Sequence, residues 1–287
     1  MRLITYTHAG HEKIGVRQGD RVIPVADIAP ELPDNLRQLL AHDGLAELGN
    51  ALDSRNNSGI AIDEIEYRPL LPEPGKIICI GRNYAAHAAE GGAETPTFPE
   101  IFYRGASSLV AHNAPIIRPL VSEKLDFEGE IAFVVGKTCR HATEETALHF
   151  VAGYTLFNDA TLRDYQRFST QWTIGKNFDG TGAFGPELVT SDELPPGVVG
   201  LRLTTKLNGE LMQDGQTDNL VFPIPTLIKI LSECMTLEPG DVVVTGTPAG
   251  VGYARKPPVW MKAGDKIEIE VEGIGKLVNT IQDEAKR

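Results

Sequence analysis

Three acidic residues stand at alternate positions directly before a long apolar run, and no other feature restricts the fold of this chain so strongly. Asp126, Glu128 and Glu130 lead into residues 131–135, and Gly136 ends the run. An apolar run of this length is typical of a buried β-strand. Because side chains alternate between the two faces of a strand, the three carboxylates are expected to share one face, about 7 Å apart at each step.

Two interpretations of this acidic strand remain open. A divalent cation would relieve the repulsion, because Mg²⁺, Ca²⁺ and Mn²⁺ prefer carboxylate oxygens as ligands. Alternatively, the strand lies at the edge of a sheet and turns its acidic face to water. The strand alone does not decide between a metal site and a solvated edge.

Length, charge and cysteine content exclude several classes of protein. The 287 residues suffice for one large domain, or for a large domain and a small one. A net charge of −12 disfavours nucleic acid as a partner, and no apolar stretch approaches the length of a membrane span. Cys79, Cys139 and Cys234 have no paired spacing, which fits a reducing compartment. We therefore expect a cytoplasmic protein that binds neither nucleic acid nor membranes.

The first 70 residues carry no convergent polar chemistry and are expected to form a small accessory domain. Strands are predicted at residues 2–7, 13–17 and 21–25, and amphipathic helices within residues 34–54. A cluster of proline and glycine from Pro69 to Gly75 marks the boundary. The predicted domains are thus an α/β domain at 1–70 and the main domain at 71–287.

An alanine-rich segment after the buried strand 76–80 is expected to form a short helix. His87 and Glu90 are i,i+3 neighbours there and share one face of the helix. A carboxylate that holds an imidazole is a common arrangement for a catalytic base. The alternative is a surface histidine beside a surface glutamate. Glycines at Gly91 and Gly92, followed by a polar loop at 92–98, would let the helix move as a lid.

Three further residues are candidates for the same site, each with a plain structural alternative. Arg104 follows a predicted strand and is either an anion clamp or an ordinary surface arginine. Asp159 ends a strand and either adds a third carboxylate to the metal or caps the helix expected at 162–168. Lys176 closes an apolar stretch at 172–176, expected to be a strand, and is either a charge partner or a catalytic cation.

The sequence of the C-terminal part predicts a hairpin, a helix and a glycine-rich turn. Asn208-Gly209 joins two predicted strands, and a helix is expected at 225–235. The strand 241–245 opens into residues 246–252, which match neither nucleotide-binding glycine pattern. Such a turn can still present backbone N–H groups and the Thr247 hydroxyl to a carboxylate.

Taken in order, these motifs resemble the fumarylacetoacetate hydrolase superfamily, in its shorter branch of acylpyruvases and 2-hydroxyhepta-2,4-diene-1,7-dioate isomerases. The resemblance covers about residues 70–283. The motifs that carry it are Gly81-Arg82-Asn83-Tyr84 with His87 and Glu90, Asp126-x-Glu128-x-Glu130, Gly153-Tyr154 with Asn158-Asp159 and Arg163-Asp164, Lys176, Asn208-Gly209 with Gln213 and Thr217, and Gly246-Thr247-Pro248-x-Gly250-Val251-Gly252.

The resemblance implies a β-rich α+β fold, a mixed β-sandwich roll, in a homodimer. It also implies one Mg²⁺ or Mn²⁺ per site, with Ca²⁺ as an alternative occupant in crystals. Glu128, Glu130 and Asp159 match the metal ligands. The implied catalytic residues are His87, Glu90 and Lys176. The candidate substrate-binding residues are Arg82, Tyr84, Arg104, Gln213 and Thr247. Two segments depart from the family: Arg104-Gly105 replaces a frequent Lys-Pro, and Ala160-Thr161-Leu162 replaces Val-Ser-Ala.

The function implied by the resemblance is hydrolysis of a C–C bond in a 2,4-dioxo acid, an acylpyruvate, to pyruvate and a carboxylic acid. The alternative is isomerisation or decarboxylation of a 2-oxo or 2-hydroxy-diene dicarboxylate through the same enolate. A third hypothesis, from a different class, is a metal-dependent binding module without catalysis. Finding His87, Glu90 and Lys176 paired away from the carboxylates would favour that third hypothesis.

Overall fold

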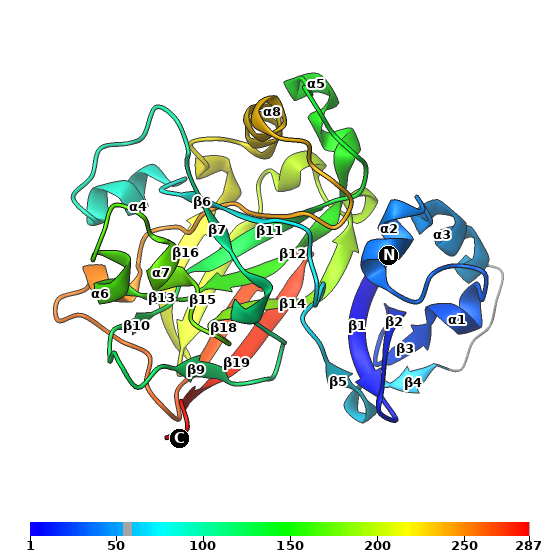
Figure 1. Ribbon diagram of the computed structural model, residues 1–287, viewed down its shortest axis with the longest axis horizontal. Helices are drawn as coiled ribbons and strands as arrows, with labels where there is room; N and C mark the ends of the chain where they lie inside the picture. The colour runs from blue at the N-terminus through cyan, green and yellow to red at the C-terminus, as the bar shows by residue number, and fades with distance from the viewer. Residues whose placement is uncertain (54–58, 287) are drawn as a thin grey trace.

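Two β-sheets packed face to face form the body of the protein (Figure 1). The computed structural model describes residues 1–53 and 59–286, and within these the larger sheet has twelve strands and the smaller five. Contacts between the sheets join β12 to β18 and β14 to β19. The fold is thus the β-rich α+β sandwich that the sequence predicts.

The larger sheet is mixed, because β6 and β17 run parallel while most other neighbours are antiparallel. Two short strands lie off its main path, β5 (Glu66–Tyr67) beside β1 and β8 (Leu109–Val110) beside β14. The main path runs in the order β4 (Ile60–Ala61), β3 (Arg21–Pro24), β2 (His11–Gln18), β1 (Arg2–His8), β14 (Gly182–Thr190), β12 (Val151–Asp159), β11 (Gly129–Val135), β17 (Val242–Val244), β6 (Ile77–Gly81) and β7 (Glu100–Arg104).

The smaller sheet shows the alternation expected of a half-buried sheet. In β18, Ile267, Ile269 and Val271 are buried, and the residues between them are partly exposed. A separate two-stranded antiparallel sheet consists of β10 (Leu125–Asp126) and β13 (Thr161–Leu162). The order of the smaller sheet is β16 (Glu210–Gln216), β15 (Arg202–Leu207), β18 (Lys266–Val271), β19 (Gly275–Asp283) and β9 (Ile116–Arg118).

Strand β11 lies at the centre of the molecule because both of its faces are buried. Ile131 and Phe133 belong to the core between the two sheets. Ala132 and Val134 belong to a second core, which the larger sheet shares with the N-terminal helices. The predicted strand is therefore confirmed, but it begins at Gly129. The chain leaves regular pairing at 127–128, so Asp126 lies in β10 and does not share a strand face with the two glutamates.

The helices are short and stand mostly at the ends of strands. Helix α8 confirms the prediction for 225–235, whereas residues 172–176, expected to be a strand, include helix α7 instead. The Asn177 side chain donates to the carbonyl of Thr173 and completes this turn, 2.8 Å apart. The α-helices are α1 (Val25–Ile28), α2 (Leu36–Ala41), α3 (Leu45–Asp53), α4 (Ala85–Glu90), α5 (Glu144–Ala147), α6 (Arg163–Gln166), α7 (Thr173–Lys176) and α8 (Ile224–Cys234).

The N-terminal segment extends the larger sheet. Strand β1 pairs with β14, where Leu3 faces Leu188, and α1 to α3 gather beside it (Figure 1). The predicted strands at 2–7, 13–17 and 21–25 are confirmed as β1, β2 and β3, and the predicted helices as α2 and α3. Residue 54, at the end of the predicted helical region, lies outside the described residues. The division into domains at 70 and 71 stays a prediction.

Candidate active site

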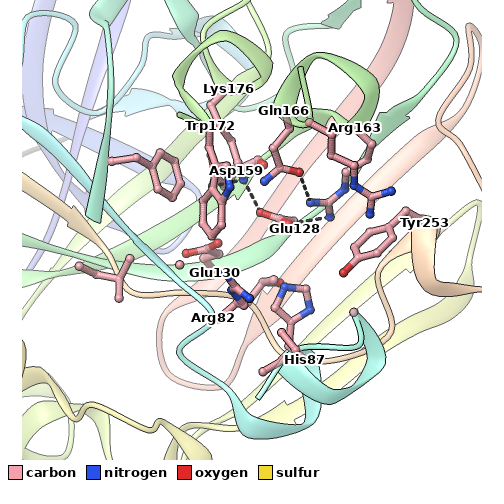
Figure 2. A pocket seen from close by; sticks show the side chains of 18 residues that line it. Arg82, His87, Glu128, Glu130, Asp159, Arg163, Gln166, Trp172, Lys176 and Tyr253 are labelled. Atoms are coloured by element: carbon pink, nitrogen blue, oxygen red, sulfur yellow. Dashed lines mark hydrogen bonds and ion pairs between the residues drawn. The ribbon is translucent and has the colours of Figure 1, made fainter. Parts of the chain in front are cut away.

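A pocket of about 200 Å³ opens where the ends of β6, β11 and β12 meet helices α4, α6 and α7 (Figure 2). Of the sequence candidates, Arg82, Thr247 and most of the proposed catalytic and metal-binding residues line it. Its full lining is Ile80, Gly81, Arg82, His87, Ala88, Gly91, Ala93, Phe102, Glu128, Glu130, Asp159, Arg163, Gln166, Arg167, Trp172, Lys176, Thr247 and Tyr253.

Three buried carboxylates converge at one end of this pocket. One oxygen each of Glu128, Glu130 and Asp159 lies within 4.8 Å of the others. Antiparallel pairing of β11 with β12 sets this geometry, because the N–H of Asp159 donates to the carbonyl of Glu128, 2.9 Å away. Asn158 holds the same turn by accepting the N–H of Glu128. The fold thus brings together acidic groups from two strands.

Asp126 takes no part in this cluster. Its carboxylate accepts the backbone N–H groups of Gly252 and Tyr253 and pairs with Arg163, at 2.8 Å from Nε. The expectation of three carboxylates on one strand face is therefore wrong for Asp126. The bend between β10 and β11 turns this side chain toward the glycine-rich segment.

Buried cations hold two of the three carboxylates. The ammonium of Lys176 lies 2.6 Å from Glu128 and 2.5 Å from Asp159. Arg163 pairs with the other oxygen of Glu128 at 2.6 Å. Burial opposes ionisation, but Arg163 and Lys176 outweigh it and lower the pKa of Glu128 to about 2. Two cations therefore keep Glu128 ionised.

Glu130 is in the opposite electrostatic situation. Burial and the charges of Asp159 and Glu128 raise its pKa well above the usual value. In the described part of the chain no ion pair reaches it, and its one hydrogen bond comes from the N–H of Gly246. Three hard oxygen ligands with one uncompensated carboxylate are a donor set that suits a divalent cation.

His87 and Glu90 form the pair that the helix spacing predicts. The Nδ1 atom of His87 lies 2.7 Å from Glu90. The second oxygen of Glu90 accepts the N–H of Gly250, so helix α4 is tied to the glycine-rich turn. Figure 2 shows the imidazole pointing into the pocket. With the proton on Nδ1, Nε2 is free to accept a proton from a molecule bound there.

The five candidate substrate-binding residues separate into two groups. Arg82 and Thr247 line the pocket, and Arg82 stacks over Trp172 at 5.5 Å while pairing with Glu100. Tyr84, Arg104 and Gln213 lie outside the lining.

Arg104 and Gln213 instead lie behind the pocket and form hydrogen bonds with residues that line it. Arg104 is buried against Asp159, 2.6 Å away. Gln213 accepts the N–H of Gly129 and donates to Thr247, so it links β11 to the glycine-rich turn. Both contacts depend on strands that are distant in the sequence.

Several residues of the pocket wall are not predicted from the sequence. Arg163 belongs to a motif that carried the family resemblance, so a signal for it existed. It also donates to Gln166, its i,i+3 neighbour on α6. For Arg167, Trp172 and Tyr253 no local pattern points to the site.

Among the described residues, every helix is too short or too polar to cross a membrane.

Comparison with known proteins gives the family. The sequence model described as "Fumarylacetoacetate (FAA) hydrolase C-terminal" matches residues 76–282. The chain is 38% identical to "Oxaloacetate tautomerase fahd2, mitochondrial" of Xenopus laevis, over 98% of this chain and 90% of that protein.

Solved structures agree with this assignment. Maleylpyruvate hydrolase from Sphingobium sp. SYK-6, solved with manganese(II) and pyruvate, is 28% identical with a TM-score of 0.82, over 99% of this chain and all of that one. The 2-hydroxyhepta-2,4-diene-1,7-dioate isomerase from Mycobacterium marinum is 28% identical with a TM-score of 0.77, over the whole of both chains. The chain belongs to the fumarylacetoacetate hydrolase family.

Proposed function

We propose that this protein is a divalent-metal-dependent hydrolase that cleaves a C–C bond in a 2,4-dioxo acid and releases pyruvate and a carboxylic acid. The observation that carries the proposal is that one pocket is lined by the acidic triad, by Lys176 and by His87, whose Nδ1 pairs with Glu90 behind it. The manganese and pyruvate recorded with the Sphingobium hydrolase support the same chemistry here.

Glu128, Glu130 and Asp159 are the proposed ligands of Mg²⁺ or Mn²⁺. Their fit rests on the short separation of their oxygens and on the lack of a cationic partner for Glu130 in the described residues. When bound, a divalent cation supplies Lewis-acid chemistry, because it orients a 2-oxo carboxylate and stabilises the negative charge that develops on its enolate.

His87 is the proposed general base. Its Nε2 atom takes a proton from water, and the hydroxide adds to the acyl carbonyl remote from the carboxylate. Glu90 holds the ring in the required tautomer and stabilises the imidazolium that forms. The bond between the acyl carbon and the methylene then breaks, its electron pair stays on the methylene, and a proton returned there completes pyruvate. Lys176 stabilises the negative charge that develops during cleavage.

An assay of pyruvate release tests this proposal. Metal-stripped protein is incubated with acetylpyruvate and with fumarylpyruvate, with and without Mg²⁺ or Mn²⁺. Pyruvate that forms only with the metal would support hydrolysis of acylpyruvates. A protein that binds the metal but releases no pyruvate from either substrate would contradict it.

Isomerisation is the second candidate, because the compared proteins include a diene-dioate isomerase and an oxaloacetate tautomerase. In that reaction His87 would move a proton between two positions of the substrate, and no water would be consumed. Decarboxylation of a 2-oxo acid would use the same enolate. The products distinguish the three reactions, because isomerisation yields only an isomer, decarboxylation releases carbon dioxide, and hydrolysis releases pyruvate together with a carboxylic acid and no carbon dioxide.

A binding module without catalysis receives less support from the geometry. His87 and Lys176 line the same pocket as the carboxylates instead of pairing elsewhere. We also propose a cytoplasmic homodimer. The three cysteines are free thiols, which suits a reducing compartment. Light scattering on the purified protein would test the dimer.

A further inference from the structure

Arg167 stands on the pocket wall, stacked on an aromatic ring. Its guanidinium carbon lies 4.8 Å from the centroid of the Tyr253 ring. Arg163 lies 4.4 Å from the same centroid. Arg163 pairs with Glu128 of the acidic triad. The Tyr253 ring therefore contacts two arginines, of which Arg163 is paired with a carboxylate of the triad and Arg167 is not.

No residue in the described part of the chain forms an ion pair with Arg167. The other cations of the pocket each pair with a carboxylate: Arg82 with Glu100, Arg163 with Asp126 and Glu128, and Lys176 with Glu128 and Asp159. In the described chain no carboxylate or carbonyl accepts from the guanidinium of Arg167, and the side chain is exposed. Its N–H groups are thus available to a ligand.

Tyr253 gives this arginine a defined position. The backbone N–H of Tyr253 donates to the buried carboxylate of Asp126. Its hydroxyl lies close to Gly91, at the end of helix α4. Because the backbone of Tyr253 is anchored and its ring packs beside helix α4, the guanidinium stacked on the ring is presented in a preferred orientation, which lowers the entropy lost when it binds an anion.

We propose that Arg167, supported by Tyr253, binds a second carboxylate at the end of the substrate's acyl chain that is remote from the triad. This inference rests on the proposed function, because the triad and its metal are taken to hold the 2-oxo carboxylate. A planar guanidinium binds a carboxylate through two parallel hydrogen bonds. The enzyme should therefore prefer acylpyruvates whose acyl group ends in a carboxylate over those with a neutral acyl group.

Binding of two matched probes tests the inference separately from turnover. 2-Oxoadipate and 2-oxohexanoate have the same carbon chain, and only the former carries a second carboxylate. Neither has the 4-oxo group needed for cleavage. Isothermal titration of the Mn²⁺-loaded protein should give a dissociation constant about tenfold lower for 2-oxoadipate, as expected for a charge-assisted pair at a partly exposed site.

Three variants and a control assign this preference to the site. Arg167→Met should reduce the preference to less than about threefold, and Tyr253→Leu should weaken it partly, because the guanidinium loses its support. Arg202→Met removes an exposed arginine paired with Asp214 on the smaller sheet and should leave the preference intact. Arg167→Lys, which keeps a charge but not the planar fork, should give an intermediate value.

The possible results distinguish the role of Arg167 from the proposed hydrolysis. Equal affinity for both probes, no binding of either, or a preference that survives Arg167→Met would overturn the role of Arg167. If the preference depends on Arg167 while neither acylpyruvate yields pyruvate, the second carboxylate site stands and the proposed hydrolysis fails.

Discussion

Arg104 donates a 2.6 Å hydrogen bond from Nη1 to Oδ1 of Asp159, and its side chain has no exposed surface. The rest of the guanidinium is satisfied by Ser108, Thr181 and the carbonyl of Ala160. The other oxygen of Asp159, Oδ2, pairs with the ammonium of Lys176 at 2.5 Å. Arg104 thus acts on the orientation of a proposed metal ligand and does not reach the pocket.

Removing Arg104 should weaken metal binding. Hydrogen bonds that orient a ligand typically contribute 10- to 100-fold in affinity, so we expect Arg104→Met to raise the dissociation constant for Mn²⁺ by about that factor. Arg104→Lys keeps one charged donor and should recover part of the loss. Titration of each variant with Mn²⁺, monitored by electron paramagnetic resonance, measures the two dissociation constants. The control is Arg118→Met, which removes an arginine far from the triad and should leave the Mn²⁺ affinity unchanged. If Arg104→Met also left the affinity unchanged, Asp159 would not need the hydrogen bond from Arg104 to bind the metal.

His87 and Glu128 should separate catalysis from metal binding. His87→Ala should lower kcat by about 10²- to 10⁴-fold, because it removes the proposed base, while Mn²⁺ still binds. Glu128→Ala should abolish both, because a ligand is lost. Steady-state kinetics and calorimetric titration of Mn²⁺ give the two readouts. Equal loss of metal in the two variants would disprove this division of roles.

Asp126 should matter for stability more than for metal binding. Asp126→Ala leaves the buried guanidinium of Arg163 without one of its carboxylates and frees the N–H groups of Gly252 and Tyr253. Breaking a buried pair from one side typically costs about 3 kcal/mol or more of unfolding free energy. Urea denaturation measures the change. The matched control is Asp214→Ala, which breaks an exposed pair with Arg202 and should lower the unfolding free energy much less than Asp126→Ala does.

His112 should make stability depend on pH in the acidic range. Burial and the charge of Arg17 lower the pKa of His112 from 6.5 to about 4, and Nδ1 accepts the N–H of Val278. Between these values the unfolded chain binds the proton and the folded chain does not, so stability is complete above pH 6.5 and falls toward pH 4.

Comparison with a variant that cannot titrate isolates this effect. His112→Asn keeps an acceptor for Val278 but carries no charge at any pH. Between pH 7 and pH 4.5 the parent should lose about 1–2 kcal/mol more unfolding free energy than the variant, allowing for partial exposure of the ring. Parallel pH profiles of the two proteins would show that His112 is protonated equally in both states.

The parts of the site that depend on local spacing could be predicted from the sequence. The apolar run fixes β11, and helical spacing fixes the contact between His87 and Glu90. In the same way, alternation places the side chains of β18 correctly.

Contacts between distant segments could not be predicted in the same way. The bend that turns Asp126 toward Arg163 depends on the pairing of β10 with β13. The burial of Arg104 depends on its place on β7 next to β6 and on Asp159 from β12. The short apolar stretch before Lys176 fits a strand or a helix equally well, because periodicity does not separate the two over five residues. Stacking of Arg167 on Tyr253 has no local signal at all.

The most direct test of the proposed reaction is the stoichiometry of products from acetylpyruvate, measured with metal-stripped protein before and after Mn²⁺ is added. Hydrolysis of the C–C bond predicts equal amounts of pyruvate and acetate, formed only with the metal and at least about 10²-fold more slowly by the His87→Ala variant. Consumption of acetylpyruvate without acetate, or release of pyruvate at the same rate without the metal, would contradict the proposed function.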